Sequence, residues 1–193
     1  MIKIKYVPNL LTIIRILIVP FYVWLTFVVN SVFSLKLAFF LFVIASFTDY
    51  LDGYLARKYN VITNFGKIMD PLADKILVIC ALAAMAWTKL SYINWWIFGI
   101  IVFREFAVTI LREIYIKKGI YIAANIWGKV KTVMQMTGII FVLFYHSFLR
   151  YNFSEAFDNN IHSLFLVYFW ITAVVTILSG ANYFFVKRKT EKK

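Results

Sequence analysis

Residues 49–74 read DYLDGYLARKYNVITNFGKIMDPLAD and carry four aspartates, Asp49, Asp52, Asp70 and Asp74. The chain has only nine acidic residues in 193, so this window holds an unusual share of them. Asp49 and Asp52 are spaced i,i+3, and Asp70 and Asp74 are spaced i,i+4, which places each pair on one face of a helix. Two such helices side by side bring four carboxylates into one space. Their mutual repulsion favours divalent cations with oxygen ligands there. Alternatively, the four aspartates form a structural polar network or a proton relay.

The composition around this window is that of a membrane protein. Hydrophobic residues make up 63% of the chain and aromatic residues 20%, and the mean hydropathy is +0.79. These values indicate a polytopic membrane protein rather than a soluble domain. The net charge of +12 indicates basic cytoplasmic flanks and contact with anionic lipid, with no nucleic-acid partner. A single cysteine, Cys80, excludes a disulfide framework within the chain.

Six apolar stretches follow a short basic, amphipathic N-terminal segment. Each is close to the roughly 20 residues that a helix needs to cross a bilayer. We therefore expect an all-α integral membrane protein, a six-transmembrane-helix bundle with an inward-facing polar cavity, formed by residues 1–193 as one domain. The expected spans cover about residues 8–29, 32–57, 66–87, 95–116, 123–149 and 161–186. Residues 150–160 are expected to form the longest polar loop.

Six spans put both termini on the same side of the membrane. Lysine and arginine are concentrated on that side, at residues 3, 5, 57, 58, 117, 118 and 187–189, against Lys36, Lys89 and Arg150 on the other. The positive-inside rule then places the termini in the cytoplasm. The expected location is the cell membrane, with a multi-pass topology and with the aspartates facing the cytoplasm.

The residues between the aspartates suggest the class of ligand. Gly53 and Ala56 are small and share a helix face with the first aspartate pair, so a phosphorylated ligand could approach the backbone there. Arg57 offers a forked donor suited to phosphate, and Gly66 allows a second close approach. Carboxylates, small residues and an arginine together fit a pyrophosphate-bearing substrate. The chemistry that follows is phosphoryl-type transfer assisted by two metal ions.

The full pattern resembles the signature of a known family. It reads D-x2-D-G-x2-A-R-x8-G-x3-D-x3-D from Asp49 to Asp74, and all eight fixed residues are those of the CDP-alcohol phosphotransferase family. The resemblance implies a six-helix membrane core, a homodimer, and two divalent cations, Mg²⁺ or Mn²⁺, on the four aspartates. It implies that Asp74 is the general base. The physical argument agrees, because a carboxylate within reach of both the metal and the acceptor hydroxyl can take the proton as it leaves. The CDP moiety would be held by Asp49, Asp52, Gly53, Ala56, Arg57 and Gly66.

Three further segments resemble one subfamily, the bacterial phosphatidylglycerophosphate synthases. They are PNLLTIIRILIVP at residues 8–20, REFAVTILR at residues 104–112 and GKVKTVMQ at residues 128–135. This resemblance implies that the donor is CDP-diacylglycerol and the acceptor sn-glycerol 3-phosphate. Attack by the acceptor hydroxyl would then give phosphatidylglycerophosphate and CMP.

A small dianionic acceptor needs fixed cations close to the metal site. Arg112, Lys129 and Lys131 lie toward the cytoplasmic ends of spans four and five, and Arg104 lies deeper in span four. We expect these four residues to bind the acceptor phosphate. Glu105 shares a helix face with Arg112, and Lys131 shares one with Gln135. Alternatively, Lys129 and Lys131 are topology charges and Arg104 forms a structural ion pair. Arg15 is a further candidate for the same cavity.

Other functions remain open on the sequence alone. The nearest alternative keeps the chemistry and changes the acceptor to inositol phosphate, serine or phosphatidylglycerol. A cation channel or transporter would explain the carboxylates but would leave Gly53, Ala56, Arg57 and Gly66 without a role. An inactive scaffold would not require the complete motif that is present.

Overall fold

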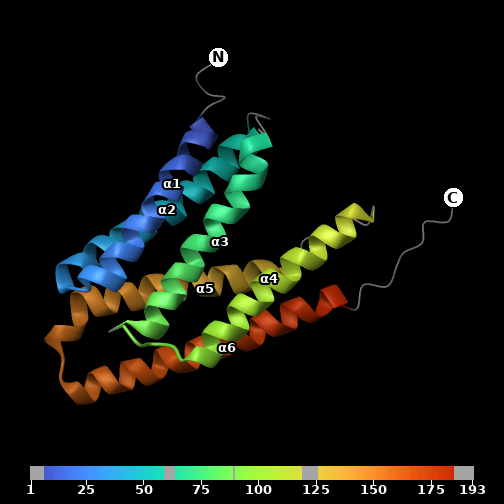
Figure 1. Cartoon of the computed structure of the whole chain (residues 1–193). Helices are drawn as coiled ribbons and strands as arrows, with labels where there is room; N and C mark the ends of the chain where they lie inside the picture. The colour runs from blue at the N-terminus through green and yellow to red at the C-terminus, as the bar shows by residue number, and fades with distance from the viewer. Residues whose placement is uncertain (1–6, 59–63, 89, 119–125, 185–193) are drawn as a thin grey trace.

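The structure, a computed structural model, describes residues 7–58, 64–88, 90–118 and 126–184, and side chains within 13–49, 51, 73, 75–88, 90–118 and 126–181. All regular structure in these residues is helical (Figure 1). The elements are α1 (Val7–Val23), the π-helical η2 (Trp24–Val29), α2 (Val32–Lys58), α3 (Asn64–Trp87), α4 (Trp95–Lys117), α5 (Ile126–Phe144), the π-helical η3 (Tyr145–Leu149), the 3₁₀ turn η4 (Arg150–Asn152) and α6 (Glu155–Phe184). The expected all-α class is confirmed.

The helices form two groups that meet at one end and diverge at the other. In Figure 1, α1, α2 and α3 run together toward the top, and α4, α5 and α6 run toward the right. The groups are joined by contacts of α2 with α5 and of α3 with α4 and α5. The closed end contains the start of α2 and the start of α6. The open end contains the start of α1, the end of α2 and the start of α3. It also contains the end of α4, the start of α5 and the end of α6.

Local sequence explains where several helices begin and end. At the start of α2, the Ser34 N–H donates to Ser31 Oγ at 3.1 Å and the Ser31 N–H donates to Ser34 Oγ at 2.8 Å, a reciprocal cap of the capping-box kind. Asn94 caps α4, because its Oδ1 accepts from the Ile97 N–H at 3.0 Å. Asn30 adopts a left-handed conformation with φ 43° and ends η2.

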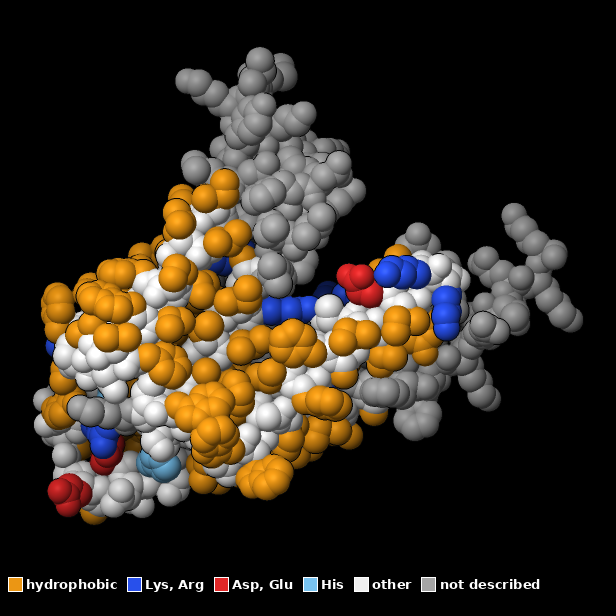
Figure 2. Space-filling model, viewed as in Figure 1, with side chains coloured by type: hydrophobic (Ala, Val, Ile, Leu, Met, Phe, Trp, Pro, Cys, Tyr) orange, Lys and Arg blue, Asp and Glu red, His pale blue; other side chains and the backbone are white. Residues whose placement is uncertain are grey.

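Three helices are long and apolar enough to cross a membrane, judged by length and composition within the described residues. Their apolar windows are Val32–Asp49, Ile126–Asn152 and Glu155–Ala181, and shorter apolar helices cover Ile13–Val29 and Lys75–Trp87. Large apolar side chains cover much of the described surface shown in Figure 2. Phe103, for example, is 76% exposed. An apolar exterior of this kind suits lipid as the surrounding solvent.

The connection between α5 and α6 is shorter than the sequence predicts. The expected polar loop at residues 150–160 is wrong for most of its length: η4 covers the first three residues, and α6 begins at Glu155, six residues before the expected start of the span. Acidic residues in the first turn, Glu155 and Asp158, suit the positive end of the helix dipole. The Asp158 N–H also donates to the Ser154 carbonyl at 3.0 Å. The polar residues of this stretch therefore mark the start of a helix and not a loop.

Two other helix starts differ from the expected spans. α3 begins at Asn64 rather than near Gly66, so Pro71 is the eighth residue of the helix. α5 begins at Ile126, and the residues expected to open that span, 123–125, lie outside the described residues. The N-terminal amphipathic segment, residues 1–6, and the basic tail, residues 187–193, lie outside them as well.

Gly138 allows α5 and α6 to pack closely. A Cβ atom at this position would come within 2.7 Å of the Tyr168 ring and 2.8 Å of the Phe169 ring. Phe169 is fully buried, and the Tyr168 hydroxyl is held by the Met134 carbonyl at 2.9 Å, so neither ring can move freely. A small residue at this helix–helix contact matches the general use of glycine in membrane bundles.

We therefore predict that Gly138→Ala destabilises the protein by about 1–3 kcal/mol through overpacking. The measurement is the apparent melting temperature of the detergent-solubilised protein. Gly99→Ala is the matched control, because its added methyl group meets open space and alanine is the better helix former. Equal stability of the Gly138→Ala protein and the wild type would contradict this account of the α5–α6 contact.

Candidate functional site

The aspartate signature lies on two consecutive helices near the open end of the molecule. α2 carries Asp49 and Asp52 in its C-terminal part, and α3 carries Asp70 and Asp74 in its N-terminal half. The two helices contact each other. The local prediction, that each aspartate pair is one helical turn apart, is therefore confirmed. The side chains of Asp52, Gly53, Ala56, Arg57, Gly66, Asp70 and Asp74 lie outside the described residues, so their convergence on one site stays a prediction.

Asp49 is the one member of the signature whose side chain is described, and it is paired with Arg15 of α1. Arg15 Nη1 lies 2.6 Å from Asp49 Oδ1. The Arg15 side chain is fully buried, whereas Asp49 is 36% exposed. A buried guanidinium inside an apolar bundle needs such a counter-ion. Arg15 thus joins α1 to α2 and fixes the orientation of the first aspartate, beside the predicted site.

The donor set fits a hard divalent cation. Aspartate carboxylates are the oxygen ligands that Mg²⁺ and Mn²⁺ prefer, and this chain places four of them on two contacting helices. The described residues contain no group of three or more histidine, cysteine, aspartate or glutamate side chains. Of the four aspartates, only Asp49 has its side chain among those described, so ligand chemistry and helix placement support the fit.

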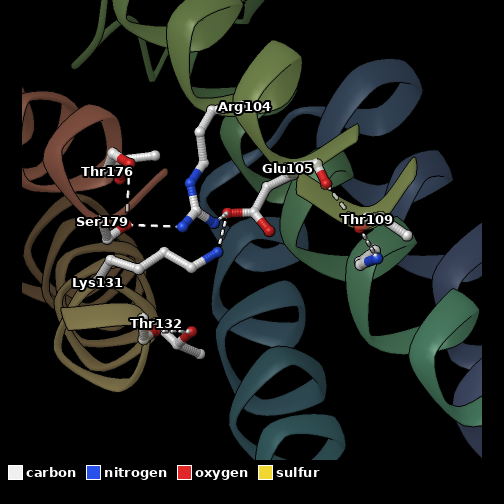
Figure 3. A network of polar contacts seen from close by, with 9 residues as sticks. Arg104, Glu105, Thr109, Lys131, Thr132, Thr176 and Ser179 are labelled. Carbon is white, nitrogen blue, oxygen red and sulfur yellow. Dashed lines mark hydrogen bonds and ion pairs between the residues drawn. The ribbon is translucent and has the colours of Figure 1, made fainter. Parts of the chain in front are cut away.

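A second polar cluster joins α4, α5 and α6 around Glu105, as Figure 3 shows. Lys131 of α5 forms an ion pair and hydrogen bond with Glu105 Oε1, and Arg104 Nη1 lies 3.5 Å from the same oxygen. Arg104 Nη2 also donates to Ser179 Oγ of α6 at 2.7 Å. The arginine fits against α6 because Gly180 has no side chain: a Cβ there would lie 3.1 Å from Arg104 Nε.

Lys75 connects this cluster to α3. Its Nζ donates to the Thr109 hydroxyl, which in turn donates to the Glu105 carbonyl at 2.7 Å. Lys75 directly follows Asp74 in the sequence, so α3 carries both the second aspartate pair and the lysine that contacts this cluster. On the face shown in Figure 2, basic side chains lie where the two helix groups meet.

A cavity of about 60 Å³ lies between α3, α4 and α5 beside this cluster. Its polar lining consists of two cations, a carboxylate, a hydroxyl and an amide, and its remaining lining is aliphatic. The lining residues are Lys75, Val78, Ile79, Leu82, Ile101, Glu105, Lys131, Thr132 and Gln135. The predicted shared face of Lys131 and Gln135 on α5 is therefore confirmed, since both residues line one cavity.

The four expected acceptor-binding cations are separated into two pairs. Arg104 and Lys131 are buried and meet at Glu105. Arg112 and Lys129 occupy exposed positions on α4 and α5. The ion pair that the sequence offered as the alternative for Arg104 is thus present. Sequence reasoning missed Lys75, although a lysine one residue after an intramembrane aspartate was a usable indication.

A third polar cluster lies at the closed end, away from the signature. The His146 ring nitrogen Nδ1 lies 3.2 Å from the Tyr92 hydroxyl and 3.3 Å from Arg150 Nη1. Arg150 in turn pairs with Asp158 at 3.2 Å. Burial raises the pKa of Tyr92, which keeps its hydroxyl protonated and available for hydrogen bonding. The interactions link the α3–α4 connection, η3 and α6, so this cluster has a packing role.

Known proteins similar to this chain share one family. The model of the CDP-alcohol phosphatidyltransferase family matches residues 5–179. Three relatives named CDP-diacylglycerol–glycerol-3-phosphate 3-phosphatidyltransferase come from Rickettsia bellii, Yersinia pestis and Bacillus subtilis. The first is 38% identical and covers 92% of each chain, and the second is 34% identical with the same coverage. The third is 39% identical and covers 75% of this chain and 69% of its own. The chain therefore belongs to the CDP-alcohol phosphatidyltransferase family.

Proposed function

We propose that this chain transfers the phosphatidyl group of CDP-diacylglycerol to a hydroxyl of sn-glycerol 3-phosphate, giving phosphatidylglycerophosphate and CMP. The observation that carries this proposal is the similarity of the chain to relatives that are named for that reaction. The similarity extends over 92% of the chain. The complete signature from Asp49 to Asp74 supports the chemistry, and the segments at 8–20, 104–112 and 128–135 support the acceptor.

In this proposal the aspartates on α2 and α3 hold two divalent cations, Mg²⁺ or Mn²⁺. The residues would be Asp49, Asp52, Asp70 and Asp74, and Arg15 would hold Asp49 in its orientation. When bound, such ions neutralise the donor's phosphates and acidify the attacking hydroxyl. The α2 residues Gly53, Ala56 and Arg57, with Gly66 of α3, would complete the CDP site together with Asp49 and Asp52.

Asp74 is the proposed general base. It takes the proton from the acceptor hydroxyl as the hydroxyl oxygen forms a bond to the lipid-side phosphorus of the donor. The bond from that phosphorus to the bridging oxygen breaks, and CMP leaves with this oxygen. Asp74 follows Asp70 by one turn of α3 and directly precedes Lys75, and this order along the helix supports the role.

The acceptor phosphate is proposed to bind cations of α4 and α5. Lys131 and Arg104 would act from the buried cluster at Glu105, and Arg112 and Lys129 from the exposed ends of the two helices. Fixed cations at a partly desolvated site are the natural partners of a phosphate dianion. A water-soluble acceptor would enter from the open end, while the acyl chains of the donor would leave between apolar helices.

We further propose that the chain forms a single domain that crosses the cell membrane six times, with its termini and active site in the cytoplasm. The described helix ends support this topology, because the start of α1 and the end of α6 both lie at the open end in Figure 1. The distribution of lysine and arginine supports the orientation. Family resemblance supports a homodimer.

The experiment that tests the reaction is CMP release by purified, detergent-solubilised protein supplied with CDP-diacylglycerol and Mg²⁺ or Mn²⁺. Glycerol 3-phosphate, inositol phosphate, serine and phosphatidylglycerol are offered in parallel. Of these four acceptors, we expect only glycerol 3-phosphate to cause CMP release. Release with a different acceptor would retain the family chemistry and overturn the acceptor. No release with any acceptor, from folded protein, would overturn the donor or the catalytic assignment.

Asp74→Asn is expected to lower kcat by about 10²- to 10⁴-fold, because the amide cannot accept the proton of the attacking hydroxyl. Binding of CDP-diacylglycerol, measured separately, should remain detectable. Glu155→Gln is the control, since it removes a carboxylate from the exposed first turn of α6 at the closed end. Full turnover by the Asp74→Asn protein would exclude Asp74 as the base.

Lys131→Met is expected to raise the KM for glycerol 3-phosphate about 10- to 100-fold, with little change in the KM for CDP-diacylglycerol, if the lysine binds the acceptor phosphate. Both constants are measured by CMP release at saturating levels of the other substrate. Lys118→Met, at an exposed position after α4, is the control. An equal rise in both constants would leave Lys131 with a structural role as the partner of Glu105.

A further inference from the structure

A larger cavity lies at the closed end of the bundle, where α2 begins and where η3 and η4 lead into α6. Its volume is about 540 Å³, which is within the usual range of small-molecule binding sites. Apart from two aliphatic side chains its lining is polar, and the polar lining residues are Asn30, Ser31, His146, Arg150 and Tyr151. A polar cavity of this size at the edge of an apolar bundle suits a polar ligand.

His146 supplies a hydrogen-bond donor to this cavity in addition to its packing contacts. The residue is 2% exposed, and its Nδ1 lies 3.3 Å from Arg150 Nη1. Because a guanidinium can only donate, Nδ1 accepts, and the neutral ring carries its proton on Nε2. Among the described residues, no hydrogen bond reaches Nε2. The Nε2–H group of a buried side chain can therefore donate to a ligand.

Arg150 and Asn30 contribute a cation and an acceptor. Arg150 contacts His146 through Nη1 and Asp158 through Nε, and no residue in the described part of the chain bonds its Nη2. The Asn30 amide oxygen is buried and likewise has no hydrogen-bond partner within that part. Native structures rarely leave such an atom unsatisfied. The cavity thus matches a ligand with anionic acceptor oxygens for the arginine and histidine and with a donor group for Asn30.

The surroundings of the cavity are those of a membrane interface. Val28 and Phe33 lie on either side of the lining turn in the sequence, and they are 69% and 70% exposed. Tyr151 lines the cavity and is 65% exposed, and tyrosine is typical of the boundary between lipid and water. Acyl chains can lie against these apolar side chains while a head group enters the cavity. A free phosphate ion gains nothing from them.

We propose that this cavity binds the head group of a membrane glycerophospholipid. The phosphodiester accepts hydrogen bonds from Arg150 and His146, and the head group donates a hydrogen bond to Asn30. Glycerol and ethanolamine head groups carry such a donor, whereas choline has none. The cavity lies at the opposite end of the bundle from the proposed active site, so this inference does not depend on the proposed reaction. In the proposed topology the lipid belongs to the outer leaflet.

Native mass spectrometry of the detergent-solubilised protein tests this site through the Kd of each lipid. Phosphatidylglycerol, phosphatidylethanolamine and phosphatidylcholine are compared in the presence of excess CDP, which occupies the proposed donor site. We expect the first two lipids to bind about 3- to 10-fold more tightly than phosphatidylcholine, because only they can donate to Asn30. Displacement of the bound lipid by CDP would assign it to the donor site and overturn the proposal.

Two substitutions remove the donors to the phosphodiester. Arg150→Gln and His146→Asn should each raise the Kd of phosphatidylglycerol about 10- to 100-fold, because each removes a donor to a charged group. Asparagine retains an acceptor in place of Nδ1 but lacks the donor at Nε2. The KM values for CDP-diacylglycerol and glycerol 3-phosphate should not change. Unchanged Kd values in folded variants, or a rise in either KM, would overturn a separate lipid site.

Asn30→Gly tests the contact with the head group. Asn30 has φ 43°, a conformation that glycine adopts without strain, so the substitution removes the amide oxygen and retains the turn. It should raise the Kd values of phosphatidylglycerol and phosphatidylethanolamine about 3- to 10-fold and leave that of phosphatidylcholine unchanged. An equal effect on all three lipids would overturn the contact between Asn30 and the head group.

Matched controls replace the same residue types outside the cavity. His162→Asn and Asn152→Gly change exposed residues at the closed end, and Lys118→Gln removes an exposed cation at the open end. These three variants should bind all the lipids as the wild type does. Apparent melting temperatures establish that every variant is folded.

Soluble anions distinguish a lipid from a free phosphate. Isothermal titration calorimetry with inorganic phosphate and with glycerol 3-phosphate should show no binding that depends on Arg150 or His146. Binding of either anion that Arg150→Gln abolishes, without any effect of this substitution on the lipids, would overturn the lipid assignment. Lipid binding that depends on Arg150 and His146 would support the site even if the chain released no CMP with any acceptor.

Discussion

A buried cation in an apolar bundle requires a counter-ion, and this requirement organises the described interior of the chain. Arg15 is fully buried and is held by Asp49, and Arg104 and Lys131 are held together by Glu105. Removing one partner of such a pair leaves an uncompensated charge, which is far more costly than the net value of the pair. The pairs therefore connect α1 to α2 and α4 to α5.

The same pairs connect the architecture to the chemistry. Arg15 pairs with the first signature aspartate, and Lys75 of α3 links the Glu105 cluster to the helix that carries Asp70 and Asp74. The closed end instead holds a hydrogen-bonded cluster of Tyr92, His146 and Arg150 that packs the helix connections together. The cluster at the closed end thus has a packing role, whereas we propose that the helices carrying the aspartates bind the phosphorylated substrates.

Much of the fold could be predicted from the sequence because it depends on local properties. Apolar stretches of bilayer length predicted the helices, and the i,i+3 and i,i+4 spacings correctly placed the aspartate pairs on α2 and α3. The predicted face shared by Lys131 and Gln135 also proved correct. The prediction failed at the start of α6, where polarity alone did not distinguish a loop from the acidic first turn of a helix.

By itself, the sequence determined the class of fold and the helices that carry each motif residue, since these follow from composition, period and spacing. The family was indicated by the resemblance of the motif from Asp49 to Asp74 to a known signature. Only the tertiary structure decided which cations meet. Arg104, Glu105 and Lys131 come from two helices, and their grouping with Lys75 of α3 and Ser179 of α6 depends on how the helices pack. Spacing along one helix fixes a face, but it does not fix which other helix that face meets. The packing of the helices against one another therefore decides that Gln135 is buried and that Arg112 is exposed.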